Sequence, residues 1–488
     1  MKKEKTDNTQ KSQLEITDAI WDQIQTFLAK CPKVRVGSPE KCRLFLSAVL
    51  WLAKEGVPWS GLPICYGNWR AVYRRFNRWC EIGVFELLKS HFHEDIEISS
   101  ILDDFYTSHI YAKSLKLRIK KSLKFQGFIV TGNEISLPEN LDKEKIRELH
   151  ALAVQHRIEE RKKGLVKHEQ MLLQNLASGK EIDPERIYPK LIEIHSGTKE
   201  ELLFRYACLH WSIPVSSGYG RRLRFLVIDQ HTNKLMGLFG LGDPVFSLGH
   251  RDQWIGWNKE DRLDRLHHVV DAFLLGAVPP YSYLLGGKLI ALLAISSEVH
   301  NTFKEKYKGR TSVIRKRKNP GEIALITTTS ALEKSSLYNR LKYKKHLAYE
   351  RVGHTQGYGE FHFSNGIYNS LTEFAKSNSN ATASHESWGS GFRNRQEVVQ
   401  KTIGALGLPK NWLNHGIKRE IYVAQLADNT RAFLRGEVDK LNYYVRPKNK
   451  LFRWFRKRWL LPRSMRDLRY REWEPEEWKL WINGVSNE

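Results

Sequence analysis

The sequence predicts an α+β protein of several domains, in which an all-helical N-terminal domain is followed by a mixed α/β body. Three observations predict this fold class. Apolar residues recur at helical spacing from Ile16 to His91, and two apolar runs typical of a β-hairpin begin at Arg222. The length of 488 residues corresponds to about three domains of roughly 150 residues. A hydrophobic share of 41% is enough for packed cores, which excludes global disorder.

The N-terminal domain is predicted to contain four helices. Their expected bounds are Ile16–Leu28, Arg43–Lys54, a third helix from Trp69 and a fourth over Phe85–His91. Thr17 or Asp18 is the expected N-cap of the first helix. The third helix carries four arginines, which are Arg70, Arg74, Arg75 and Arg78. Helix-turn-helix proteins place such a helix against DNA, and this favours DNA binding over an amphipathic helix whose arginines simply face water.

Residues 114–200 are predicted to form a helical connector, with a long charged helix over Asp142–Leu176 and another opened by Asp183 and Pro184. The α/β domain follows. Its expected elements are a hairpin of Arg222–Asp229 and Lys234–Gly240, a strand Val269–Ala277, a helix Ser282–Tyr307, a strand Ile323–Ser330, a helix Ser335–Arg340 and strands near His346–Gly353. Gly366–Glu386 is rich in Ser and Asn and is expected to be a flexible excursion.

The charge balance predicts a polyanionic partner, because 79 Lys+Arg face 54 Asp+Glu and give a net charge of +25. Two basic patches lie outside the third helix. The first consists of Arg221, Arg222 and Arg224 after a Ser/Gly-rich stretch, which suits phosphate contact. The second is Arg446–Arg471, where Arg453, Arg456 and Arg458 alternate with aromatic residues. This alternation suits a nucleic-acid backbone, and equally a C-terminal helix docked through its aromatics.

The cysteines, the N-terminal tail and the length of the apolar runs indicate the cellular compartment in which we expect the protein. The five cysteines are an odd number without a CxxC motif, so a disulfide scaffold, a zinc finger and any other assigned metal site are not expected. The N-terminal tail, residues 1–13, is polar and does not read as a secretory signal. No apolar run reaches the roughly 20 residues of a membrane span. We therefore expect a cytoplasmic protein without a membrane partner.

The segment from about Leu14 to Lys113 resembles the N-terminal domain of bacterial insertion-sequence transposases. The resemblance is carried by the strings at 15–18, 43–51, 56–59, 67–69, 72–76 and 83–86. It implies a DNA-binding helical domain that recognises the ends of a mobile element. In that family a nuclease with a DDE triad follows, and its first acidic residue matches Asp103, whereas the second Asp and the Glu have no match in this chain.

The segment from about Leu115 to Trp481 resembles the DruA family, whose members are components of Druantia anti-phage defence systems. The matching strings lie at 210–222, 240–244, 251–257, 284–288 and 353–360. The resemblance implies that the chain fuses a transposase-type DNA-binding domain to a DruA-like body, and that it works with other proteins of a defence system or a mobile element.

Two chemistries remain open for this body. The order of hairpin, strand, helix, strand, helix and hairpin is that of GNAT-type acetyltransferases, with Gly286 and Gly287 near the expected acyl-CoA loop. Alternatively, Asp229 ends a strand like the first strand of an RNase-H-like nuclease, and Mg²⁺ would then be its cofactor. The weak catalytic candidates across the chain are Asp103, Asp229, Asp252, His354 and Glu360, with Asp243 and Asp271 as further carboxylates for the nuclease reading.

The sequence thus predicts a polar tail (1–13), a helix-turn-helix-like domain (14–113), a connector (114–200), an α/β domain with a GNAT-like order (201–445) and a basic aromatic segment (446–488). The predicted function is DNA binding in a mobile element or an anti-phage defence system. A metal-dependent nuclease or transposase is the first alternative, and a GNAT-type acyltransferase is the second. No cofactor is assigned, and a complete catalytic triad is not found in the sequence.

Overall fold

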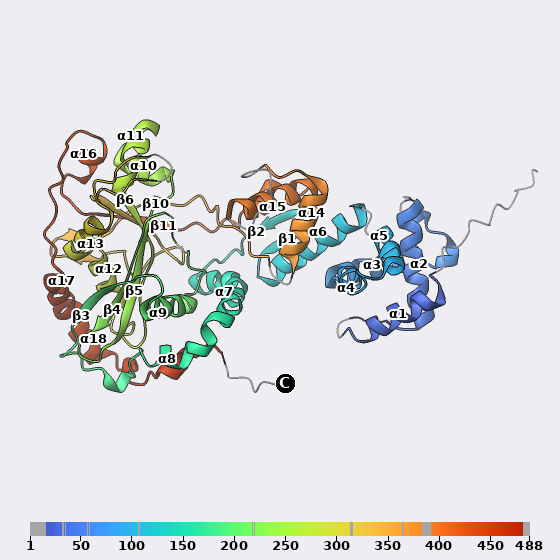
Figure 1. The fold of residues 1–488 in the computed structure, drawn as a ribbon, viewed down its shortest axis with the longest axis horizontal. Helices are drawn as coiled ribbons and strands as arrows, with labels where there is room; N and C mark the ends of the chain where they lie inside the picture. Colours follow the sequence, from blue (N-terminus) through green and yellow to red (C-terminus); the bar gives the residue numbers. More distant parts are fainter. Residues whose placement is uncertain are drawn as a thin grey trace, which may run out of the picture. The chain divides into compact units, whose positions relative to one another are not determined.

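A computed structural model describes residues 16–31, 34, 36–55, 57, 59–105, 108–216, 218, 220–312, 316–363, 366–382 and 392–481. The chain divides into two compact units. The first unit joins Met1–Pro138 to Phe363–His415, and the second joins Glu139–His362 to Gly416–Glu488. The first is mostly helical and the second is mixed α/β, which confirms the predicted fold class in outline (Figure 1). This division does not coincide with the boundaries expected at residues 113, 200 and 445.

Helices close to the predicted ones begin the first unit. They are α1 (Asp18–Ala29), α2 (Pro39–Glu55), α3 (Trp69–Ile82), α4 (Val84–His91) and α5 (Ile96–Phe105), with 3₁₀ turns η1 (Trp59–Gly61) and η2 (Ile64–Tyr66). Thr17 caps α1 by accepting from the Ile20 N–H, as predicted, and Asn68 caps α3 in the same way. Gly83, in the left-handed region at φ 72°, lets the chain turn directly from α3 into α4. Trp79 is fully buried in the core that these helices share.

The first unit is completed by a segment far along the chain. Its further elements are α6 (Ser108–Phe125), β1 (Ile129–Thr131), β2 (Glu134–Ser136), α14 (Ile367–Asn378), α15 (Phe392–Ala405) and η7 (Lys410–Leu413). The prediction of a flexible excursion over 366–386 is wrong for α14, because Ile367, Leu371 and Phe374 are buried along one helical face. Residues 383–386 lie outside the described residues. Arg118 of α6 donates to the Ser370 hydroxyl at 3.1 Å and so ties α6 to α14.

The second unit is built on a seven-stranded sheet with the order β10-β11-β7-β6-β5-β4-β3. Its strands are β3 (Pro189–Glu193), β4 (Arg222–Asp229), β5 (Lys234–Gly242), β6 (Val269–Ala277), β7 (Leu325–Thr329), β10 (Glu350–His354) and β11 (Glu420–Gln425), and a separate hairpin joins β8 (Lys342–Tyr343) to β9 (His346–Leu347). All neighbouring strands of the large sheet are antiparallel except β6 and β7. The predicted β4–β5 hairpin and strand β6 are confirmed.

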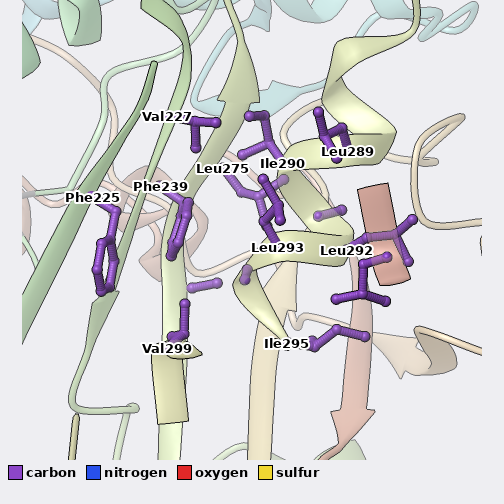
Figure 2. Close-up of a cluster of buried hydrophobic side chains, with 14 of the residues drawn as sticks. Phe225, Val227, Phe239, Leu275, Leu289, Ile290, Leu292, Leu293, Ile295 and Val299 are labelled. Atoms are coloured by element: carbon purple, nitrogen blue, oxygen red, sulfur yellow. The ribbon is translucent and has the colours of Figure 1, made fainter. Parts of the chain in front are cut away.

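Helices cover both faces of this sheet. Successive side chains of a strand point to opposite faces, and those of β4 are apolar on both. Phe225 and Val227 of β4 pack with Leu289, Ile290 and other residues of the α12 side (Figure 2). Leu226 and Ile228 pack on the other side, with α7, α8 and α9. The helices of the unit are α7 (Lys143–Leu165), α8 (Glu169–Leu173), α9 (Lys199–Ala207), α10 (Gly249–Ile255), α11 (Lys259–Arg265), α12 (Gly286–Ala294), α13 (Ser297–Tyr307), α16 (Thr430–Leu434), α17 (Lys448–Phe455) and α18 (Leu461–Arg466).

Single turns complete the second unit. Its 3₁₀ turns are η3 (Val166–His168), η4 (Gly179–Glu181), η5 (Cys208–His210), η6 (Leu266–His268), η9 (Arg469–Arg471) and η10 (Pro475–Trp478), and a π-helical turn, η8 (Arg456–Leu460), joins α17 to α18. In the described part of the chain, no helix combines the length and the apolarity that crossing a bilayer requires.

Several predicted helices of this unit are wrong or too long. Asp183 caps a single turn, in which its carboxylate accepts from the Glu185 N–H at 3.0 Å, and the chain then enters the edge strand β3. Ser335 likewise closes a turn through the N–H groups of Leu337 and Tyr338, so no helix forms over 335–340. The helix predicted over 142–176 ends at Leu165, and the one over 282–307 is two helices separated at Ser296, which caps α13.

Candidate nucleic-acid interface

Three of the four predicted arginines of α3 lie on one exposed face. Arg70, Arg74 and Arg78 are spaced four residues apart, so they follow one another along the helix at intervals of about 6 Å. The opposite face of α3 is buried through Val72, Phe76 and other core residues. Among the residues that the structure describes, no carboxylate pairs with these three guanidinium groups. The helix therefore presents a row of cations that none of the described carboxylates neutralises.

Arg75, the fourth arginine, has a different role. Its guanidinium donates to the backbone carbonyl of Val36 at 2.8 Å and lies over the rings of Phe45 (4.7 Å) and Trp79 (5.2 Å). Burial lowers its pKa from the ordinary value. Arg75 thus packs α3 against α2 and the preceding loop, and it does not belong to the exposed row.

The predicted patch after Gly220 is also divided. Arg221 pairs with Asp243, donates to the carbonyl of His267 at 2.8 Å and lies over the Phe303 ring, so it is held by the protein. Arg222 is exposed. Arg224 pairs with Glu201 at 2.9 Å. Of the stretch before this patch, Ser217 and Tyr219 lie outside the described residues.

The C-terminal segment places its aromatic residues in the core rather than on a stacking surface. Phe452 and Phe455 are buried, and Trp454 and Trp459 pack against the same cluster. The arginines of this segment differ among themselves. Arg456 pairs with Glu185, whereas Arg453 and Arg458 are exposed.

Two of the candidate catalytic carboxylates are occupied by structural contacts. Asp229 is buried and accepts from the backbone N–H groups of Tyr188 (3.0 Å) and His231 (3.1 Å) and from the Tyr281 hydroxyl (3.0 Å). Asp252 is buried between Arg251 (2.6 Å) and Arg262 (2.9 Å).

The other candidates do not assemble into a site either. Asp103 lies on α5 beside Lys89, at 2.8 Å, and Glu360 is exposed. His354 lies 3.3 Å from a guanidinium nitrogen of Arg351. Within the described ranges, no three His, Cys, Asp or Glu side chains are grouped so that they could hold a metal ion.

Three further arginines line a pocket and were not predicted as site residues from the sequence. Arg157 and Arg161 of α7 and Arg205 of α9 line one pocket together with Arg222 and Arg224. The four-residue spacing of Arg157 and Arg161 on a helix was a readable signal. That α7 and α9 meet β4 at one pocket could not be predicted, because these segments are far apart in the sequence.

Comparison with known proteins gives two separate matches. The family model described as Druantia protein DruA matches residues 140–436, and the model described as a transposase of the IS4/5 family (DUF4096) matches residues 16–88. The Druantia protein DruA of Escherichia coli (strain UMEA 4076-1) is 37% identical over 366 residues, which cover 74% of this chain and 90% of that protein.

A second relative covers only the N-terminal helices. The uncharacterized protein y4sN of Sinorhizobium fredii is 41% identical over 71 residues, or 14% of this chain and 57% of that protein. No solved structure matches the chain. Both resemblances expected from the sequence are therefore confirmed.

Proposed function

This chain belongs to the DruA family, and from that premise we propose that it is a DNA-binding component of a Druantia-type anti-phage defence system. The observation that carries the proposal is the exposed row of Arg70, Arg74 and Arg78 on α3. This helix belongs to the region that matches the transposase model. We assign α3, which packs against α2, as the helix that meets the DNA.

The physical basis is electrostatic. Guanidinium groups contact phosphate oxygens with two N–H groups each and release condensed counterions from the duplex. The net charge of +25 supplies a long-range attraction to any polyanion. The arginine row gives this attraction a defined surface.

The decisive experiment measures duplex affinity as a function of salt. In fluorescence anisotropy with a labelled duplex, the full chain should lose affinity steeply as salt rises. The variant Arg70→Gln/Arg74→Gln/Arg78→Gln should reduce the slope of log K against log salt by about 2.7, at roughly 0.9 per lost phosphate contact. A matched variant, Lys259→Gln/Lys376→Gln/Lys440→Gln, removes the same charge from exposed sites elsewhere. Equal effects of the two variants would contradict an interface on α3.

The same role places the protein in the cytoplasm together with its DNA. All five cysteines are free thiols, which supports a reducing compartment. As a defence component it would act with other proteins of the same system, so pull-down of a tagged chain from cells that carry the whole system tests this part of the proposal.

For the second unit we propose a GNAT-type scaffold without acyl transfer. The support is the order of the β4–β5 hairpin, β6, α12, α13 and β7, with β6 and β7 as the parallel pair. This proposal rests on two N–H groups that acyl-CoA would need, because those of Gly286 and Lys288 already donate to the carbonyls of Tyr281 and Leu285, both at 2.9 Å. Acetyl-CoA should therefore leave the melting temperature unchanged, whereas a rise would restore the acyltransferase alternative.

A further inference from the structure

A pocket of about 240 Å³ lies in the second unit, on the face of the sheet that α9 covers. Its wall is formed by α7, α9 with the following turn, the loop 211–216 and strands β4 and β6. Arg222 and Arg224 reach it because they are two residues apart on β4 and so point to the same face. The pocket lies outside the unit that carries the exposed row of α3.

The charge of this pocket is one-sided. Five arginines line it, and none of its lining residues carries a carboxylate. Arg224 alone of the five has an ion pair with a described residue, the 2.9 Å contact with Glu201. Four guanidinium groups, those of Arg157, Arg161, Arg205 and Arg222, are left without such a pair. Like charges gathered around one cavity repel one another, so an anion with several oxygen atoms would stabilise the arrangement.

The pocket also has an aromatic side that is built into the sheet. Gly240 pairs with Leu274 and Leu241 pairs with Ala272, so Phe273 is the extra residue of a β-bulge, a feature that re-aims a side chain. The Phe273 ring occupies the space where a Cβ on Gly240 would stand, 2.3 Å from its Cζ atom. Trp211 lies in the same way over Gly276, where a Cβ would come within 2.7 Å of the indole. The glycines therefore allow both rings to approach the strand backbone closely.

The pocket is suited to binding rather than to thiol chemistry. Cys208 lines it, and burial raises the pKa of its thiol to about 12, although Arg157 and Arg224 act in the opposite direction. The thiol is thus protonated at neutral pH and a poor nucleophile. The volume of the pocket, about 240 Å³, is close to the lower end of the range for small-molecule sites, roughly 300 Å³ and above. The pocket is too small for a duplex.

We propose that this pocket binds a single nucleotide through its terminal phosphate. The guanidinium groups would contact the phosphate oxygens, and the rings of Phe273 and Trp211 would support the sugar or the base. A free mononucleotide and the phosphorylated end of a DNA strand share this chemistry. The site is additional to the DNA-binding surface proposed on α3 and does not depend on it.

The first experiment tests whether nucleotide binding depends on the phosphate group. Calorimetric titration of the full chain with deoxyadenosine monophosphate should give saturable binding, and deoxyadenosine should give none. Arg157→Gln/Arg222→Gln should weaken binding by at least about tenfold, the effect of losing one charge-assisted contact, whereas Lys440→Gln/Lys450→Gln should not. Equal binding of the nucleotide and the nucleoside, or unchanged affinity in the arginine variant, would overturn the proposal.

Two controls keep the result interpretable. Arg161→Gln changes a single exposed side chain, so it tests the site even if the double variant unfolds. The Arg70→Gln/Arg74→Gln/Arg78→Gln variant should keep full nucleotide affinity, which separates a failure of this site from a failure of the α3 interface.

The second experiment distinguishes the two sources. In the α3 variant, labelled deoxyadenosine monophosphate is displaced by unlabelled deoxyadenosine monophosphate, by a 5′-phosphorylated single strand or by the same strand with a 5′-hydroxyl group. Stronger competition by the phosphorylated strand than by the mononucleotide identifies a DNA end as the ligand. Stronger competition by the mononucleotide identifies a free nucleotide. Equal displacement of the label by the two strands, at a lower concentration than the mononucleotide needs, contradicts a terminal-phosphate site.

Discussion

The hydroxyl of Tyr281 donates a 3.0 Å hydrogen bond to the carboxylate of Asp229, and both side chains are buried. The same carboxylate accepts from the backbone N–H groups of Tyr188 and His231. It therefore joins the entry to β3, the β4–β5 turn and the loop before α12. A residue that resembles a metal ligand in the sequence holds three loops together in the structure.

This network makes Asp229 a stability residue. Asp229→Ala should lower the free energy of unfolding by about 3 kcal/mol, because the buried hydroxyl of Tyr281 and two partly buried backbone N–H groups lose their acceptor. Urea unfolding followed by tryptophan fluorescence measures the change. Asp439→Ala, at an exposed position, serves as the control and should leave the unfolding curve in place. A wild-type midpoint for Asp229→Ala would show that the network contributes little.

Neighbouring arginines of α3 should behave in opposite ways. Arg75→Ala should cost about 1–2 kcal/mol of stability, because it removes a hydrogen bond to Val36 and the contacts with Phe45 and Trp79. Arg74→Ala should leave stability within about 0.5 kcal/mol and weaken duplex binding. Thermal melting and anisotropy on both variants check this, and the reverse pattern would place Arg75 on the DNA side.

Two buried histidines predict acid sensitivity of the second unit. Burial lowers the pKa of His150 to about 4 and that of His268 to about 3, whereas both return to about 6.5 on unfolding. The unfolded chain therefore binds protons first as pH falls. Their contribution to stability is present above pH 6.5 and should decline by about 1 kcal/mol per histidine per pH unit below it.

His268→Gln should reduce this decline in the free energy of unfolding by about 1 kcal/mol per pH unit, which is the contribution of one histidine. The measurement is the free energy of unfolding at pH 7 and pH 5.5. His195→Gln is the control, since His195 is exposed. An unchanged pH slope in His268→Gln would mean that the pKa of this ring does not change on folding.

Gly240 and Phe273 should be coupled. Gly240→Ala would bring a methyl group against the Phe273 ring, so we expect a loss of about 1–3 kcal/mol from overpacking. Adding Phe273→Leu should recover part of this loss, because the shorter side chain frees the space. A double-mutant cycle by urea unfolding measures the coupling, and additive effects would contradict the contact. Gly164→Ala, where nothing lies within 4 Å of the new methyl group, is the matched control.

Local sequence signals predicted those elements whose neighbours in the chain are also their neighbours in space. The β4–β5 hairpin follows from two apolar runs around the turn at 230–233, and β6 follows from an apolar run in which Asp271 is the one charged residue. Strand β3 was missed because this edge strand carries Lys190 and Glu193 and gains its place only by pairing with β4. The break before α13 was hidden because apolar residues continue up to Ser296.

The functional surfaces were predictable to different extents. Arg75 lies three residues after Val72 and four before Trp79, so helical spacing alone could have assigned it to the core side. The pocket arginines could not be grouped in this way, because α7, α9 and β4 meet only through the packing of helices on a sheet. The bulge at Phe273 depends on pairing between strands and leaves no local pattern.

The discontinuity of the first unit has a consequence for how the protein is made. Helix α6 leaves the ribosome early, but α14, which packs with it, and α15, which packs with α14, follow only after most of the second unit has been synthesised. The transposase-like region therefore completes its helical partners late in translation. A nascent chain that ends before residue 363 would carry the arginine row of α3 on an unfinished unit, so gene truncations intended to isolate DNA binding should retain residues 363–415.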